Sequence, residues 1–173
     1  MFLQASLRDD LMQFWYDKYP DLYRQEIQAM NKYFPAFKMY KLPDGRLYWR
    51  GKVNPTGSGV IWDLKIIYTH EHPYNINNEY GGTIDVYPVS PKLEEIIQKV
   101  GSIPHVYSKT IAGKKDYFIC TVRSHEFKNK KLSDGMYQTS SAATCLGWAC
   151  KWIVVFELWL NGNVGDEAFE HTY

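Results

Sequence analysis

A long apolar stretch near the end of the chain constrains the fold more than any other feature of the sequence. Residues 142–160 form a run of 19 positions that is too long for an ordinary strand, so the pattern predicts a helix. The run begins after Thr139-Ser-Ser, any of which can cap a helix, and ends at Asn161-Gly162, which is typical of a helix end. The positions that are not apolar are Thr144, Gly147, Lys151 and Glu157.

This run is just long enough to cross a membrane, but its charges argue against that. Lys151 and Glu157 lie well inside it, and each charge near a bilayer centre costs about 2.5–3.5 kcal/mol. Its apolar residues form two adjoining stripes, as expected of a helix that packs on two sides in a protein core. We therefore expect no membrane association.

The first part of the chain predicts a helix followed by strands. Apolar residues in 3–34 recur every three to four positions, and Pro20 is expected to break the helix near Tyr19. Turn residues such as Pro43-Asp44-Gly45 separate the alternating segments that follow, which favours an antiparallel meander. The four predicted strands are 37–42, 47–49, 60–68 and 83–87.

The middle of the chain gives weaker signals. Residues 91–100 predict a short helix with Pro91 in its first turn. Residues 101–116 predict an irregular stretch, and the apolar residues 117–122 predict a short strand. The whole pattern indicates an α+β fold in one domain, residues 1–173.

Composition excludes several classes of protein. The 20 basic and 19 acidic side chains give a formal charge of +1, so there is no overall field to attract nucleic acid. The basic run at 128–131 is expected to be a solvated loop. Aromatic residues make up 16% of the chain, which suits both a core and a partner-binding surface. We expect no nucleic-acid partner.

The cysteines point to reduced thiols and to one candidate nucleophile. Three cysteines cannot form a closed disulfide framework, and the N-terminus lacks the pattern of a secretion signal, so a cytoplasmic protein is expected. Cys145 and Cys150 lie in the apolar run, where a thiol behaves as a small hydrophobe. Cys120 lies in a short apolar strand and has two interpretations, a buried strand cysteine or a nucleophile.

No motif predicts a cofactor or a metal. The sequence contains no P-loop, GxGxxG, GxSxG or HExxH pattern. His70 and His72 would share one face of a strand, which permits metal ligation, but a packed or solvated pair is the simpler interpretation.

The order of these elements resembles the ubiquitin-conjugating enzyme superfamily, and more specifically the stand-alone conjugating proteins of bacterial CBASS anti-phage operons. That fold has an N-terminal helix, a four-stranded antiparallel meander, a long loop that delivers a cysteine, and C-terminal helices. The segments that carry the resemblance are Val86-Tyr-Pro-Val-Ser-Pro91, Pro104-His105-Val-Tyr107, Tyr117-Phe-Ile-Cys120 and the tryptophan-rich segment from Trp148 to Gly162.

The resemblance implies a thioester-forming enzyme. Cys120 would be the nucleophile, and His105 would orient the loop or assist the thiol. The carried group would be the C-terminal carboxyl of a cGAS-like nucleotidyltransferase, or a ubiquitin-like protein, passed on to an amine. An activating enzyme is a possible further partner, since the chain has no signature for adenylation. The alternative is an inactive scaffold of the same fold that binds a partner protein.

The sequence departs from the family in the motif whose asparagine is assigned to stabilise the oxyanion. The eukaryotic members carry His-Pro-Asn, whereas this chain reads Pro104-His105-Val-Tyr107, and no Asn occurs between Asn78 and Asn129. The oxyanion donor would then be a backbone N–H, Tyr107, Thr121 or a group of the partner; Tyr117 is a further candidate for partner binding.

Overall fold

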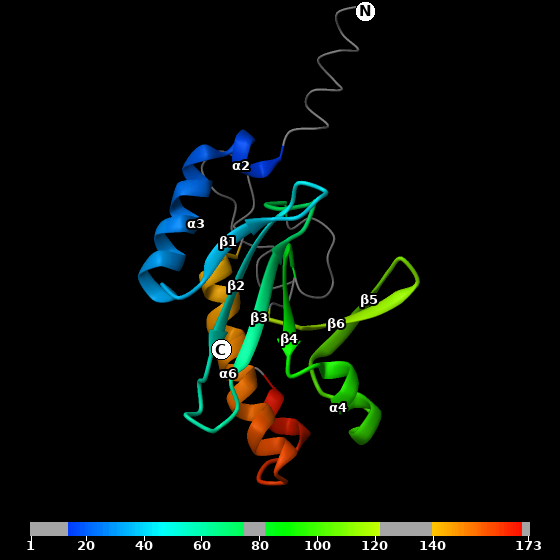
Figure 1. Ribbon diagram of the computed structural model, residues 1–173. Coiled ribbons are helices and arrows are strands. Elements are labelled where there is room, and N and C mark those ends of the chain that lie inside the picture. Colours follow the sequence, from blue (N-terminus) through cyan, green and yellow to red (C-terminus); the bar gives the residue numbers. More distant parts are fainter. Residues whose placement is uncertain (1–13, 75–81, 122–139, 171–173) are drawn as a thin grey trace, which may run out of the picture.

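The computed structural model describes residues 14–74, 82–121 and 140–170 (Figure 1). In chain order the helices and strands are α2 (Trp15–Lys18), α3 (Pro20–Tyr33), β1 (Lys38–Lys41), β2 (Leu47–Val53), β3 (Trp62–Tyr68), β4 (Ile84–Ser90), α4 (Leu93–Val100), β5 (Val106–Ile111), β6 (Lys114–Ile119), α6 (Ala142–Leu160) and the 3-10 helix η1 (Asp166–Phe169).

The strands form one antiparallel sheet in the order β1-β2-β3-β4-β6-β5. The four-stranded meander predicted from the sequence is confirmed, since β1 to β4 pair in chain order. The helix predicted at 3–34 is confirmed from Trp15 onward, and the long helix at the end is confirmed as well. Residues 3–13 and the basic run at 128–131 lie outside the described residues. This α+β arrangement is compatible with the ubiquitin-conjugating fold.

The prediction of an irregular stretch at 101–116 is wrong, because β5 and β6 form a hairpin there. Ala112 and Gly113 have φ angles of 49° and 77°, and two positive φ values belong to the two-residue turn that joins twisted antiparallel strands. β6 begins with the polar residues Lys114 to Asp116, so the start of this strand has no apolar alternation by which the sequence could reveal it. The hairpin projects from the end of the sheet and brings the sheet to six strands (Figure 1).

The helix predicted at 91–100 begins later than expected. β4 continues through Pro88 to Ser90, beyond the predicted end at Tyr87, with a change of register between Asp63 and Leu64 of β3. A proline is tolerated in a strand at such an irregularity. Because the strand runs on, α4 starts at Leu93 and Pro91 lies before it rather than in its first turn.

The predicted break near Tyr19 is confirmed, because Tyr19 separates α2 from α3 and Pro20 is the first residue of α3. Pro suits that position because its missing N–H would have no helical partner there. The β1–β2 turn packs against α2: a Cβ at Gly45 would overlap the Phe14 ring, and the φ of 90° at Gly45 also favours glycine. The Tyr16 hydroxyl donates to the Gly45 carbonyl at 2.9 Å.

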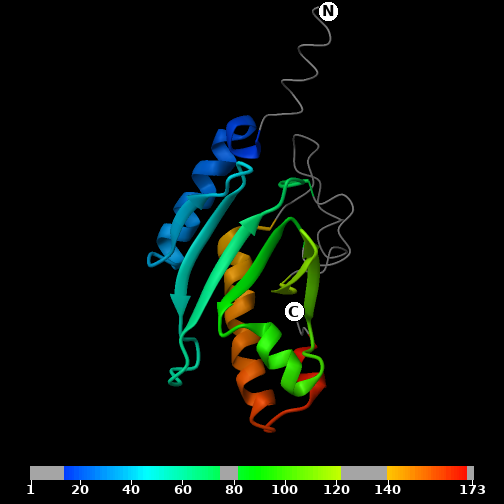
Figure 2. The ribbon, with the colours of Figure 1, turned by 45° about the vertical axis from the view of Figure 1, so that its right-hand side comes forward.

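The helices α2, α3 and α6 cover one face of the sheet, where the main core lies (Figures 1 and 2). Trp62 of β3 has no exposed surface and packs edge-on against Trp152 and Phe156 of α6. Its Nε1 donates to the Glu157 carboxylate at 3.0 Å, which ties the sheet to the helix. The Ser141 hydroxyl accepts from the backbone N–H of residue 144 at 3.0 Å, so one of the predicted caps is confirmed.

Within the described part of the chain, α6 is the one helix long and apolar enough to cross a membrane. That criterion uses only length and composition, and the core helix of a soluble protein also meets it. Eight of its 19 residues are buried against the rest of the described structure, so core packing accounts for much of its apolar character.

No helix of the described chain covers the other face of the sheet, which we call the open face (Figure 2). A small cluster of Ile67, Tyr87 and Phe118 is buried there, with Tyr48 and Tyr107 packed at its sides. Paired side chains of neighbouring strands point to the same face, so the registers assign each strand residue to the core face or the open face.

Candidate functional site

Cys120 is the first residue after β6, and two observations fix its side of the sheet. Phe118 packs in the open-face cluster, whereas Ile119 lies in the main core. Thr121 is on the core side, since its side chain is among the groups that lower the pKa of the Cys145 thiol of α6. Side chains alternate along an extended chain, so Cys120 belongs to the open face. Its side chain is 4% exposed.

The segment containing His105 holds Cys120 through the backbone. The Cys120 N–H donates to the His105 carbonyl at 2.8 Å, which continues the β5–β6 ladder beyond its last strand pair. Trp152 Nε1 donates to the Pro104 carbonyl at 3.1 Å, and the His105 ring lies nearly parallel to Phe169 with centroids 6.5 Å apart. His105 has a φ of 57°, a strained value that these contacts maintain. The His105 segment therefore contacts Cys120 through its backbone carbonyl, while its ring packs against Phe169.

The three other predicted site residues do not lie together. Tyr107 pairs with Phe118 across the hairpin, and their rings are 6.2 Å apart on the open face. Thr121 is buried on the core side beside Cys145. Tyr117 packs against the main core and lines a cleft described below. Of the two predicted oxyanion side chains, Tyr107 is the one that shares a face with the thiol.

The thiols of α6 suit a structural role. Burial raises the pKa of Cys145 to about 12, although the neighbouring Thr121 and Ser140 act in the opposite direction. Burial also raises the pKa of Cys150 to about 11. Both thiols are therefore protonated at neutral pH, and a protonated thiol is a poor nucleophile.

A buried carboxylate lies next to Cys120, and the sequence analysis missed it. β4 and β6 pair at Val86 and Ile119; one residue further along this antiparallel register, Asp85 stands opposite Cys120 on the open face. Asp85 is 2% exposed, and one of its oxygens, Oδ2, accepts from Lys109 Nζ and, at 3.3 Å, from the Tyr87 hydroxyl. The signal in the sequence was a lone acidic residue inside the apolar strand Ile84–Ser90.

A second buried carboxylate lies on the core face at the start of α6. Glu26 Oε2 accepts from the Tyr68 hydroxyl at 2.6 Å and from the Ala142 N–H at 2.9 Å. Tyr68 in turn accepts from Trp49 Nε1 at 3.0 Å. Burial is the largest influence on Glu26 and raises the pKa of its carboxyl, although both hydrogen bonds lower it. This network fixes the beginning of α6 against β2, β3 and α3.

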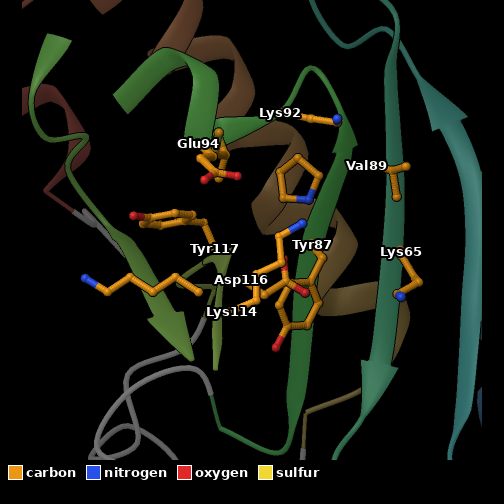
Figure 3. Close-up of a pocket in the computed structure, with 11 residues that line it drawn as sticks. Lys65, Tyr87, Val89, Lys92, Glu94, Lys114, Asp116 and Tyr117 are labelled. Atoms are coloured by element: carbon orange, nitrogen blue, oxygen red, sulfur yellow. The ribbon is translucent and has the colours of Figure 1, made fainter. Parts of the chain in front are cut away.

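A cleft of about 230 Å³ lies where β4 and β6 diverge, and α4 closes one end of it (Figure 3). Tyr117 and Tyr87 lie on its two sides. Four lysines and two carboxylates contribute to its lining, which gives it an excess of positive charge. Tyr87 also donates to Asp85, so the cleft adjoins the open-face cluster near Cys120. The charged lining residues are Lys65, Lys92, Lys114, Lys115, Glu94 and Asp116.

The described residues contain no group of three or more His, Cys, Asp or Glu placed to hold a metal ion. The two histidines considered as ligands have different surroundings. His72 is 3% exposed and its Nδ1 shares a hydrogen bond of 2.9 Å with Thr83, whereas the exposed His70 lies 3.7 Å from Asp44. His72 is therefore the packed histidine of the pair, and His70 is the solvated one.

Acid is expected to destabilise the fold through His72. Burial lowers the pKa of His72 from its ordinary value of 6.5 to about 3, so between these values the unfolded chain binds a proton that the folded protein does not bind. Between pH 7 and pH 5 this difference should lower the free energy of unfolding by about 2 kcal/mol. The carboxyl pKa values of Glu26 and Asp85 are raised by burial and act in the opposite direction.

Urea unfolding of the wild type and of His72→Gln at both pH values isolates this effect, since the two proteins share the carboxyls. The decrease should be smaller by about 2 kcal/mol in His72→Gln. The exposed His70 supplies the control His70→Gln, which should keep the wild-type decrease. Equal decreases in the wild type and His72→Gln would contradict the assignment.

A family model described as "Type II CBASS E2 protein" matches residues 26–170, which is most of the chain and includes every predicted site residue. No curated protein matches the chain.

Proposed function

Since this chain belongs to the type II CBASS E2 proteins, we propose that Cys120 forms a thioester with the C-terminal carboxyl of a cGAS-like nucleotidyltransferase and transfers it to an amine. A conjugating role in CBASS follows from the family; the thioester, the carried protein and the site residues are the proposal. The observation that carries it is the place of Cys120 at the end of β6, beside a buried carboxylate and secured to His105.

The three thiols of the chain favour Cys120 as the nucleophile. Cys145 and Cys150 lie in α6 with raised pKa values, which argues against both of them. Cys120 lies instead on the open face, outside the layer of helices. With 4% of its surface exposed, the thiol must be uncovered before an acyl chain can reach it, and docking of the partner would supply that movement.

Activation of the carboxyl belongs to another component. The chain has no nucleotide-binding motif, so either a separate activating enzyme charges Cys120 or the protein acts on a carbonyl that is already activated. We place the reaction in the cytoplasm, with the nucleotidyltransferase as the principal partner.

The test is the formation of an adduct between the protein and a cGAS-like nucleotidyltransferase of its CBASS operon. We expect a reductant-sensitive adduct on non-reducing gels, lost in Cys120→Ala and on removal of the partner's C-terminal residues. Cys150→Ala is the matched control and should keep the adduct, since that thiol lies in α6. An adduct that persists in Cys120→Ala would contradict the assignment, and so would its absence with both the partner and any activating enzyme present.

The burial of Cys120 favours a second candidate, an inactive scaffold that binds a partner through the same fold. The missing asparagine of the His-Pro-Asn pattern agrees with it. Mild alkylation of the folded protein separates the two candidates. With the nucleotidyltransferase bound, selective labelling of Cys120 supports the enzyme, whereas equal inertness of all three thiols supports the scaffold.

A further inference from the structure

We infer that Asp85 is the group that binds the acceptor amine and takes its proton when the amine attacks the Cys120 thioester. This inference rests on the proposed function and adds to it a residue on a different strand from the nucleophile. Three properties of Asp85 carry it: its position beside Cys120, the unequal use of its two oxygens, and the cation already bound to one of them.

The position follows from the sheet. Val86 pairs with Ile119, so Asp85 and Cys120 are the next residues opposite one another, and both belong to the open face. Neighbours of this kind have Cβ atoms about 4.5–5.5 Å apart in a regular antiparallel pair. An amine held by the Asp85 carboxylate would thus approach a carbonyl carbon carried on the adjacent sulfur.

The two oxygens of Asp85 are used unequally. Oδ2 accepts from both Lys109 and Tyr87, whereas no residue of the described chain donates to Oδ1, which is buried. A buried carboxylate oxygen without a donor is costly and unusual in a folded protein. A carboxylate with a purely structural role would be expected to have donors at both oxygens, so the vacant acceptor favours a ligand that donates hydrogen bonds.

The bound cation shows what this carboxylate accommodates. Lys109 reaches Asp85 from β5 with a side chain that is 40% exposed, so an ammonium group on a flexible chain already fits against Oδ2. An acceptor lysine has the same chemistry and could donate to Oδ1. An acyl chain can reach Cys120 only if the surface above the thiol opens. Because Asp85 stands opposite Cys120 on the same face, that opening would expose Asp85 as well.

The surroundings suit a proton acceptor. Burial is the largest influence on Asp85 and raises the pKa of its carboxyl, against the opposing effects of Lys109, Tyr87 and the more distant Arg46. A carboxyl with a raised pKa takes a proton from an ammonium group more readily than an exposed one does. Neutralising the acceptor exposes the nitrogen lone pair that the attack requires.

The transfer step moves two protons from the acceptor nitrogen, one to Asp85 and one to sulfur. The acceptor ammonium gives one proton to Asp85 Oδ1, and the freed lone pair forms the C–N bond at the thioester carbonyl. The C–S bond breaks and its electron pair stays on sulfur, giving the Cys120 thiolate. A second proton passes from nitrogen to that thiolate, which restores the thiol, and Asp85 releases its proton to solvent.

The test separates transfer from loading. The full chain is first mixed with a nucleotidyltransferase that lacks its C-terminal residues, whose docking would uncover the thiol. It is then loaded with the 2-mercaptoethanesulfonate thioester of acetylglycine, and the adduct is discharged to lysine or to hydroxylamine. Hydroxylamine is a strong nucleophile that is unprotonated at neutral pH, so it needs no proton acceptor. In Asp85→Asn we expect loading to persist, discharge to lysine to fall about 100-fold, and discharge to hydroxylamine to stay at the wild-type rate.

Asp63→Asn is the matched control, because Asp63 lies on the open face of β3, pairs with Ser90 at the far end of β4 from Asp85, and accepts from Arg50. It should discharge to both nucleophiles at the wild-type rates. Equal slowing of both nucleophiles in Asp85→Asn would assign Asp85 a structural role and overturn the inference, as would an unchanged rate with lysine. Acylation of Lys109, found by peptide mass spectrometry, would also overturn it by making Lys109 the acceptor.

A measurement on the wild type covers the case in which Asp85→Asn fails to fold. The ratio of the lysine rate to the hydroxylamine rate, corrected for ionisation of the two nucleophiles, should rise as the pH increases through the Asp85 ionisation; a constant ratio would overturn the inference. Failure of Cys120 to load in the wild type would instead overturn the proposed function, and this inference with it.

Discussion

Trp62→Ala is expected to lower the free energy of unfolding by about 4 kcal/mol, the largest loss of stability that we predict for a single side chain. Trp62 has no exposed surface and contacts Trp152 and Phe156 at centroid distances of 6.0 and 5.5 Å. Truncation removes the apolar contact and leaves a cavity that the sheet and α6 cannot close. It also removes the donor that binds Glu157.

The neighbouring residue supplies the matched control for this measurement. Ile61 is 58% exposed, so Ile61→Ala should change the free energy of unfolding by no more than about 0.5 kcal/mol. Urea unfolding followed by circular dichroism compares the two variants with the wild type. A loss below about 1 kcal/mol in Trp62→Ala would contradict the close packing of β3 on α6.

Glu26→Ala is expected to cost about 3 kcal/mol for a different reason. The variant removes the acceptor of two buried donors, the Tyr68 hydroxyl and the Ala142 N–H, and each donor left unsatisfied costs about 1–3 kcal/mol. Glu26→Gln should cost less, because an amide oxygen can still accept from both donors. The difference between the two variants therefore measures the loss of the accepting oxygen together with the buried side chain that carries it.

The same unfolding assay checks this prediction. Equal losses in Glu26→Ala and Glu26→Gln would show that the negative charge, and not the accepting oxygen, stabilises the start of α6. The neighbouring Arg24→Ala is the control, since Arg24 pairs with Asp21 on the surface of α3 and an exposed pair contributes little.

Local signals in the sequence were enough for the helices and for the meander. The break at Tyr19 follows from the chemistry of Pro20, which lacks an N–H, and the cap at Ser141 follows from its hydroxyl. The alternation before and after Pro43-Asp44-Gly45 depends only on neighbouring residues. These features hold in the structure because each depends on a few adjacent positions.

The β5–β6 hairpin was missed because its strands are only half covered. Half of their twelve residues are exposed and only two are buried, so they carry little of the apolar alternation that marks a strand. The turn at Ala112 and Gly113 is equally inconspicuous, since only the second residue is a glycine. Backbone pairing along the whole hairpin, rather than burial, specifies these two strands.

The sequence by itself determined the elements, the family resemblance and the choice of Cys120 as the candidate nucleophile. Only the tertiary structure decided what surrounds that thiol. Asp85 is 35 residues from Cys120 in the chain, and pairing of β4 with β6 makes them neighbours. Alternation across the sheet then puts Tyr107 on the side of the thiol and Thr121 on the other, because one step along a strand reverses the face of a side chain.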